Sequence, residues 1–286
     1  VAFAAKDPVF AIAAGKRVVA VARSANQDIP ARECRFKELA GEVVNDFRFG
    51  RFKSRQIEQL AEFETAEISD ALNRMFTMDP AIRNVVNEMP LYGPAVTVKV
   101  FPGDNLMVHK ALDMVRPGDV RVVDTSGAPR NACVGDMIGN KAKHLGVAGF
   151  VIDGLVRDIS GLRKIGLPVY ASGITSFGPL HRGPGELGHA ISCGGIVVNS
   201  GDAICADSSG IVVVNKNFVE ETIAHLKTQQ KSLEQYTLNV QKGDFSNEWV
   251  DKQLTLDGCL FEISINKNRI VELDTFHLGI LKACAQ

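Results

Sequence analysis

The chain has 286 residues, of which 45% are hydrophobic and 23% are charged, and these values are typical of folded globular proteins. They argue against collagen-like, coiled-coil and wholly disordered classes, and the length allows one large domain or two smaller ones. The formal net charge of −1 at pH 7 provides no basic field for nucleic acid or an anionic membrane surface, so we expect neither partner.

Residues 1–45 contain no clear pattern of helix or strand, and we interpret them as an N-terminal extension. No apolar run approaches the ~18 residues of a membrane span, and the first thirty residues lack the continuous apolar stretch of a secretory signal. The first 32 residues carry five basic and two acidic side chains. We therefore expect a cytoplasmic protein, with targeting to an organelle as the alternative.

The first predicted elements are helical. Residues 57–75 are rich in helix formers, and Thr65 and Ser69 are candidate caps that split the stretch into two helices. The Pro- and Gly-rich turn at 90–94 then leads into residues 95–101, whose alternating hydrophobicity predicts a strand.

Helices and strands alternate in the next segment. Residues 105–115 and 135–144 are predicted helices, and residues 120–124 and 146–153 are predicted strands. The last of these strands is almost continuously apolar, which indicates burial on both faces. This alternation is typical of an α/β domain.

The following segment is rich in strands. A short helix after Arg157 precedes predicted strands at 167–173, 194–202 and 207–215, and a helix runs from about Phe218 into the 230s. The strands favour a mixed sheet within one core domain.

We place this core domain at residues 46–235 and a C-terminal extension at residues 236–286. Within the extension, residues 260–265 (LFEISI) are a candidate strand.

Residues 183–188 (GPGELG) match the dinucleotide fingerprint G-x-G-x-x-G. That motif must follow a strand and open a helix, whereas a Gly/Pro-rich loop precedes this one and a strand-like segment follows it. We interpret it as a Gly-rich surface loop. No serine-hydrolase, zinc-protease or P-loop motif occurs in the chain.

The cysteines and histidines form no recognisable metal motif. No C-x-x-C pair occurs, so we expect reduced and mostly buried thiols in a reducing compartment. We interpret His109 and His144 as packing or capping residues. The cysteines are Cys34, Cys133, Cys193, Cys205, Cys259 and Cys284.

Asp136, Arg157 and Asp158 are the candidate functional side chains, because they occupy strand-to-helix connections that lie along the ligand-bearing edge of an α/β sheet. Two carboxylates there can hold a hard divalent cation, and an arginine can balance negative charge on a substrate oxygen. Helix capping would also explain these residue types, and Asp153 competes with Asp158 as a ligand.

The connection after Gly135 is a candidate anion site. If a helix begins there, the backbone N–H groups of Met137, Ile138 and Gly139 lie at its N-terminus, where a substrate carboxylate can bind.

The chain contains several separated motifs whose order resembles that of the RraA-like family. This family includes the 4-hydroxy-4-methyl-2-oxoglutarate/4-carboxy-4-hydroxy-2-oxoadipate aldolases. The 20 residues between Asp136 and Arg157, followed by Asp158, match the D-x20-R-D signature of these aldolases. The resemblance covers roughly residues 60–228. The other motifs are GPAVTV, GDN, PGDV, GVAGFVIDGLVRD, LPVYASG, GGIVV and SGDAICADSSGIVVV.

The resemblance implies a swivelling β/β/α fold that assembles as a homotrimer or homohexamer. It also implies a class II aldolase that uses Mg²⁺ or Mn²⁺ and releases pyruvate from a 2-oxo acid through a stabilised enolate. By this likeness Asp158 holds the metal, Asp136 orients metal-bound waters, Arg157 contacts the oxo oxygen and the turn after Gly135 receives the pyruvate carboxylate. The simplest base for the substrate hydroxyl is a metal-activated water, and oxaloacetate decarboxylation is an expected side activity.

The resemblance leaves three alternatives. The chain could act on a different substrate in specialised metabolism, or it could be a non-catalytic binding protein like the ribonuclease regulators of the family. A Schiff-base mechanism on Lys99 is a third possibility. In the aldolases a neighbouring subunit contributes an acidic residue to the site, and Glu234 and Asp244 are the candidates here.

Overall fold

The computed structural model describes residues 9–11, 18–21 and 54–259. The chain divides into two compact units, residues 1–232 and 233–286. None of the helices in the described ranges is both long and apolar enough to cross a membrane.

The first unit is built on a mixed sheet of eleven strands whose centre is parallel. Strands β4, β5, β7 and β8 run parallel to one another. The remaining strands of the order β1-β2-β9-β4-β5-β7-β8-β3 are antiparallel to their neighbours. The central strands are β4 (Leu91–Val100), β5 (Val120–Asp124), β7 (Gly149–Val156) and β8 (Val169–Ile174). The antiparallel strands are β1 (Val9–Ala11), β2 (Val18–Val21), β9 (Gly185–Leu187) and β3 (Arg83–Asn84).

Successive side chains of the central strands face opposite sides of the sheet and so enter two different cores. Phe150 and Ile152 of β7 pack with three helices on one face. Val151 between them packs on the other face against a second β layer. The helices are α3 (Leu106–Ala111), α4 (Asp136–His144) and α5 (Ile159–Ile165), and the second layer contains β10 (Ile191–Cys193), β11 (Ile196–Val198), β12 (Ala203–Ala206) and β13 (Ile211–Val214).

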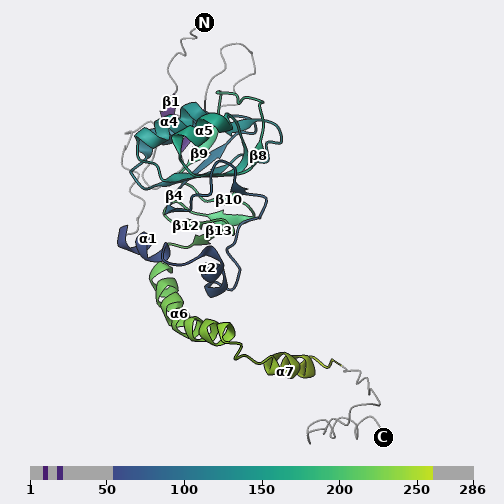
Figure 1. The fold of residues 1–286 in the computed structure, drawn as a ribbon. Coiled ribbons are helices and arrows are strands. Elements are labelled where there is room, and N and C mark those ends of the chain that lie inside the picture. The colour runs from purple at the N-terminus through teal and green to yellow at the C-terminus, as the bar shows by residue number, and fades with distance from the viewer. Residues whose placement is uncertain (1–8, 12–17, 22–53, 260–286) are drawn as a thin grey trace, which may run out of the picture. The chain divides into compact units, whose positions relative to one another are not determined.

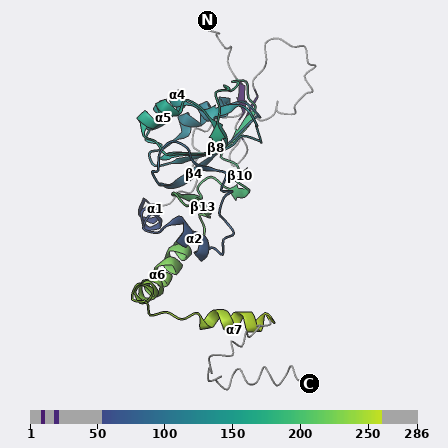
Figure 2. The same ribbon diagram turned by 45° about the vertical axis from the view of Figure 1, so that its right-hand side comes forward.

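A third cluster covers the outer side of this second layer. It joins β12 and β13 to α1 (Ser54–Leu60), α2 (Thr65–Ala71) and the first turns of α6 (Val219–Gln241). Figures 1 and 2 show these layers in order, with α4 and α5 over the sheet on one side and β12, β13, α1 and α2 on the other. The predicted α/β class and the β/β/α layering are thereby confirmed.

Asp207 joins the second β layer to α2. Its carboxylate accepts hydrogen bonds from the Thr65 amide at 2.8 Å and the Thr65 hydroxyl at 2.6 Å, and from the Ser209 amide at 2.7 Å. Burial raises the pKa of this carboxyl, but the bonds from Thr65, Ser209 and Gly210 outweigh burial, so the pKa lies below 3.8.

Asp207→Ala should therefore lower the free energy of unfolding by about 1–3 kcal/mol at pH 7, because the Thr65 donors lose a charged acceptor. Since the folded-state pKa is depressed, the stabilisation is complete above the unfolded pKa and is lost as pH falls through the folded value. Urea titrations of both proteins at pH 7 and at pH 3 or below test this. A difference that persists unchanged at the lower pH would contradict it.

Most predicted elements are confirmed, with differences at their ends. The stretch 57–75 does split into two helices, but the N-cap of α2 is Glu64, in a capping box with Glu67, and Thr65 follows it. Strand β4 begins at Leu91 rather than at residue 95, because residues 91–94 pair with β12. The sequence did not predict β12 as a strand of its own. The remaining short elements are β6 (Ala132–Val134) and a 3-10 turn at Leu112–Met114.

The Gly-rich segment 183–188 is not simply a surface loop. Residues Gly185–Leu187 form β9, which pairs with β4. A Cβ on Gly185 would overlap the Lys99 carbonyl oxygen and lie 2.6 Å from the Met107 Cγ, so only glycine permits this close approach. The prediction of a surface loop was wrong because β9 pairs with β4 and packs against α3, and both elements are distant from residues 183–188 in the sequence.

Of the four cysteines in the described ranges, Cys133, Cys193 and Cys205 are free and buried, as predicted, and Cys259 is free and exposed.

The second unit contains the C-terminal part of α6 and α7 (Glu248–Leu256), none of whose residues is buried. The candidate strand at 260–265 lies outside the described residues.

Candidate active site

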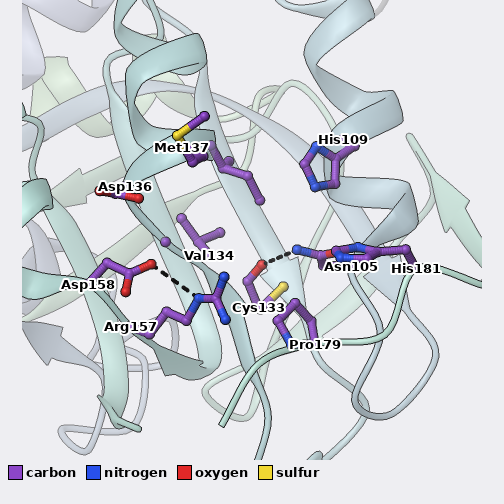
Figure 3. Close-up of a pocket in the computed structure, with 12 residues that line it drawn as sticks. Asn105, His109, Cys133, Val134, Asp136, Met137, Arg157, Asp158, Pro179 and His181 are labelled. Atoms are coloured by element: carbon purple, nitrogen blue, oxygen red, sulfur yellow. Dashed lines mark hydrogen bonds and ion pairs between the residues drawn. The ribbon is translucent and has the colours of Figure 1, made fainter. Parts of the chain in front are cut away.

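A cavity of about 210 Å³ lies where β6 and β7 end and α4 begins. The Arg157 amide donates to the Val134 carbonyl at 3.0 Å, which extends the parallel pairing of β6 and β7 to the strand ends. The two connections predicted to carry function therefore lie side by side. The lining residues are Asn105, His109, Cys133, Val134, Gly135, Asp136, Met137, Ile138, Arg157, Asp158, Pro179 and His181 (Figure 3).

Arg157 and Asp158 form an ion pair on one side of this cavity, with 3.1 Å between Nε and Oδ2 and each side chain 41% exposed. Asp158 is the N-cap residue of α5, in the left-handed region at φ +56°. Its side chain makes no capping hydrogen bond within the described chain. The capping interpretation of this carboxylate is therefore wrong, and Asp158 is available to a ligand.

Glycines make the space that these side chains occupy. A Cβ on Gly135 would lie 2.5 Å from the Asp158 Oδ2 and 3.2 Å from the Arg157 Cγ. A Cβ on Gly178 would lie 2.6 Å from an Arg157 guanidinium nitrogen. On the neighbouring turn, a Cβ on Gly161 would lie 2.7 Å from the Asp136 Oδ2. All three candidate side chains thus lie against backbone that no larger residue could replace without displacement.

The N-terminus of α4 also borders the cavity. Its N-cap is Gly135, which has no side chain to cap the helix, and the first intrahelical bond runs from the Gly139 amide to the Gly135 carbonyl at 3.0 Å. The Gly139 amide is thus committed to the helix. The amides of Met137 and Ile138 precede it and lack intrahelical acceptors, so they are the donors left for an anion.

Two candidates from the sequence lie elsewhere. The Asp153 carboxylate accepts the Gly194 amide at 2.9 Å, and Lys99 pairs with Asp124 at 3.5 Å. Neither Asp153 nor Lys99 lines the cavity. Glu234 and Asp244 belong to the second unit.

The far side of the cavity carries polar residues that were not among the site residues predicted from the sequence. Figure 3 shows His109, Asn105 and His181 across from the Arg157–Asp158 pair. Asn105 is the N-cap of α3, and its Oδ1 lies 2.6 Å from the His181 Nδ1. The GDN motif pointed to Asn105, but no local pattern pointed to His181, which enters from a loop 76 residues away.

Burial shifts the pKa of two groups on this side, His109 and Cys133. It lowers the pKa of His109, Lys141 and His181 lower it further, and Asp104 opposes the shift. Burial likewise raises the pKa of the Cys133 thiol to about 12, so this cysteine is protonated and unreactive at neutral pH.

The carboxylates suit one kind of metal. Within the described ranges no three His, Cys, Asp or Glu side chains gather as a ligand cluster for any metal ion. Asp136 in the first turn of α4 and Asp158, whose side chain makes no capping bond, are two carboxylates that line the cavity. One or two carboxylates, with waters completing the shell, is the usual protein contribution to an Mg²⁺ site.

Three comparisons with known proteins bear on this site. The family model described as RraA-like, Aldolase/RraA, matches residues 65–213, which is about half of the chain. A protein of Halalkalibacterium halodurans, provisionally named a 4-hydroxy-4-methyl-2-oxoglutarate aldolase, is 37% identical over 174 residues, which cover 61% of this chain and 83% of the relative.

Two solved structures are similar but carry other names. Streptomyces coelicolor RraAS2, described as an unusual member of the RNase ES inhibitor RraA family, is 25% identical with a TM-score of 0.60, over 66% of this chain and 98% of its own. A Geobacillus kaustophilus protein titled S-adenosylmethionine:2-dimethylmenaquinone methyltransferase is 30% identical with a TM-score of 0.51, over 54% and 96%. Because these names differ, only the chemistry of the site can separate the functions.

Proposed function

The chain belongs to the RraA-like family, and from this premise we propose that it is an aldolase that cleaves a C–C bond of a 4-hydroxy-2-oxo acid and releases pyruvate. One observation carries the proposal. Arg157 is ion-paired with Asp158, whose side chain makes no capping bond to α5, and both line the same cavity as Asp136 and the N-terminus of α4. The aldolase names of relatives such as the Halalkalibacterium protein support it.

Different residues of the site bind the substrate and stabilise the negative charge that develops during the reaction. The amides of Met137 and Ile138 receive the substrate's 1-carboxylate at the positive end of α4. The Arg157 guanidinium faces the 2-oxo oxygen, where negative charge develops as the C–C bond breaks. Because the ion pair with Asp158 orients Arg157 before the reaction, in space that Gly135 and Gly178 leave open, this charge is stabilised with little reorganisation.

Asp158 and Asp136 would hold a divalent cation, Mg²⁺ or Mn²⁺, the first directly and the second through water. Such a cation supplies Lewis-acid stabilisation of the developing oxyanion when it is bound.

The test is release of pyruvate from 4-hydroxy-4-methyl-2-oxoglutarate and from oxaloacetate, each with Mg²⁺ or Mn²⁺ and again with excess chelator. We expect pyruvate from both substrates, because both reactions leave the pyruvate enolate, and loss of activity on chelation that added metal restores. Activity that survives complete metal removal would overturn metal dependence.

The name of the Streptomyces structure favours a second candidate, a non-catalytic protein that binds a ribonuclease. Absence of pyruvate from folded, metal-supplemented protein on both substrates would leave this candidate, or an aldolase of different substrate, in place of the first.

We also propose a homotrimer or homohexamer, in which Glu234 or Asp244 of a neighbouring subunit reaches the site. Exposed apolar side chains around the cavity support an interface there: Met137 is 70% exposed, and Phe177 and Leu180 are also exposed.

A further inference from the structure

The wall of the cavity opposite Arg157 has its own hydrogen-bond network. Asn105 at the start of α3 is buried, and its Nδ2 donates to the Cys133 carbonyl at 2.9 Å. A carbonyl oxygen can only accept, so this bond fixes which end of the amide faces His181. The Asn105 Oδ1 therefore accepts from the His181 Nδ1 at 2.6 Å.

This orientation decides the tautomer of His181. Since Nδ1 carries the proton that Asn105 accepts, the neutral imidazole has its lone pair on Nε2. A histidine held through Nδ1 by a neighbouring acceptor, with Nε2 unprotonated, is the usual arrangement of a general base.

Two further contacts hold His181 in place. Its ring packs edge-to-face against the His109 ring, with the centroids 5.7 Å apart and the planes at 67°. The next residue, Arg182, donates its amide to the buried carboxylate of Asp104 at 2.5 Å, while the Leu106 amide donates to the other oxygen at 2.7 Å. The loop that carries His181 is thereby fastened to the start of α3.

We propose that His181 is the general base for the 4-hydroxyl proton of the substrate, and that Asn105 is its positioning residue. The inference rests on the proposed function, and it replaces the metal-activated water expected from the sequence. It fits the placement of the groups, because a substrate bound at its 2-oxo acid end near Arg157 extends its 4-hydroxyl end toward the opposite wall (Figure 3).

The proton and electron pairs balance in this step. The His181 Nε2 takes the hydroxyl proton, the O–H electron pair forms the new carbonyl at C4, and the C3–C4 pair moves into the enolate of pyruvate. The imidazolium then returns the proton to C3, which gives pyruvate and restores neutral His181.

Oxaloacetate provides a test within the same site. Its decarboxylation breaks a C3–C4 bond, releases CO₂ and leaves the same enolate, but it has no hydroxyl proton to remove. His181 therefore gains no proton to return, and C3 takes its proton from water. Loss of a base for the hydroxyl should therefore impair aldol cleavage and spare decarboxylation, whereas distortion of the enolate-binding side would impair both.

The experiment measures kcat and KM for both reactions in the full chain with Mg²⁺, using His181→Gln and His181→Ala. We expect kcat for cleavage of 4-hydroxy-4-methyl-2-oxoglutarate to fall about 10²–10⁴-fold, the usual contribution of a general base. The kcat for decarboxylation of oxaloacetate should stay within a factor of about three of the value for the unmodified protein. Added imidazole should restore cleavage in His181→Ala, because a small base can enter the space left by the ring.

Asn105→Ser tests positioning in the same way: cleavage should fall while decarboxylation is spared, and circular dichroism checks the fold because Asn105 is buried. His144→Gln is the matched control, since His144 is an exposed histidine at the end of α4 that does not line the cavity.

Equal losses in both reactions of His181→Gln, a change in KM alone, or unchanged cleavage would each overturn the assignment of the base. Failure of the unmodified protein to release pyruvate from either substrate would instead overturn the proposed function.

Discussion

Arg157→Ala is expected to reduce kcat/KM for pyruvate release from both substrates about 10²–10³-fold, as removal of other preorganised charge stabilisers does. The guanidinium is the one cationic side chain among the residues that line the described cavity, apart from histidines. Its loss leaves the developing oxyanion without this partner in either reaction. Steady-state assays with oxaloacetate and 4-hydroxy-4-methyl-2-oxoglutarate measure the effect.

The same substitution should leave the fold almost unchanged. The side chain is 41% exposed, and an exposed ion pair such as that with Asp158 contributes about 0–1 kcal/mol to stability. Arg157→Lys keeps the charge but not the planar fork, so it should recover only part of the activity. The matched control is Arg83→Ala, an exposed arginine in β3 that does not line the cavity. A loss of several kcal/mol in Arg157→Ala would indicate a structural role and would contradict the prediction.

Gly135→Ala is expected to lower the same kcat/KM values about 10²-fold, although position 135 bears no functional side chain. The added Cβ would lie 2.5 Å from the Asp158 Oδ2, so the Arg157–Asp158 pair must move. A displacement of about 1 Å in a catalytic group can cost about 10²-fold in rate. The backbone of Gly135 is extended, at φ −135°, so alanine meets no conformational strain there.

Gly135→Ala should lower the free energy of unfolding by only about 1 kcal/mol, because alanine is a poorer N-cap than glycine. Gly173→Ala is a suitable control, since its Cβ would contact only the flexible end of Leu155, at 3.1 Å, and Gly173 does not line the cavity. Thermal melts and pyruvate assays on both variants separate the two effects. Full activity in Gly135→Ala would show that the position of the ion pair is not critical.

The two predictions examine different properties of the site. Arg157→Ala removes a charge, whereas Gly135→Ala retains every functional group and changes only its position. If both lower aldol cleavage and decarboxylation together, the enolate side of the cavity is common to the two reactions. The His181 variants should then be distinguished by their selective effect on cleavage.

Local patterns predicted much of the framework. Apolar continuity identified β7, and the Gly-Asp turn identified the start of α4 at Asp136. The position of Asp136, Arg157 and Asp158 at strand-to-helix connections singled out the side chains that the structure brings to one cavity. These features depend on residues close together in the sequence, through the periodicity of helices and strands and through turn chemistry.

Sequence alone could not choose between a ligand role and a capping role for Asp158, because both use an acidic residue at a helix start. The structure argues against the capping role, because the side chain of Asp158 makes no capping bond in the described chain, and it places that carboxylate beside Gly135 at the cavity. It likewise separated Asp153, whose carboxylate is bound by the Gly194 amide across the sheet.

The sequence by itself determined the α/β class, the order of most elements and the identity of the charged residues at the strand ends. Only the tertiary structure decided that β9 joins the sheet, that Gly178 makes room for Arg157 and that Asn105 orients His181. The physical reason is the range of the interactions. Periodicity and turn preference act over a few neighbouring residues, whereas strand pairing and cavity walls join segments tens of residues apart through packing that no local pattern encodes.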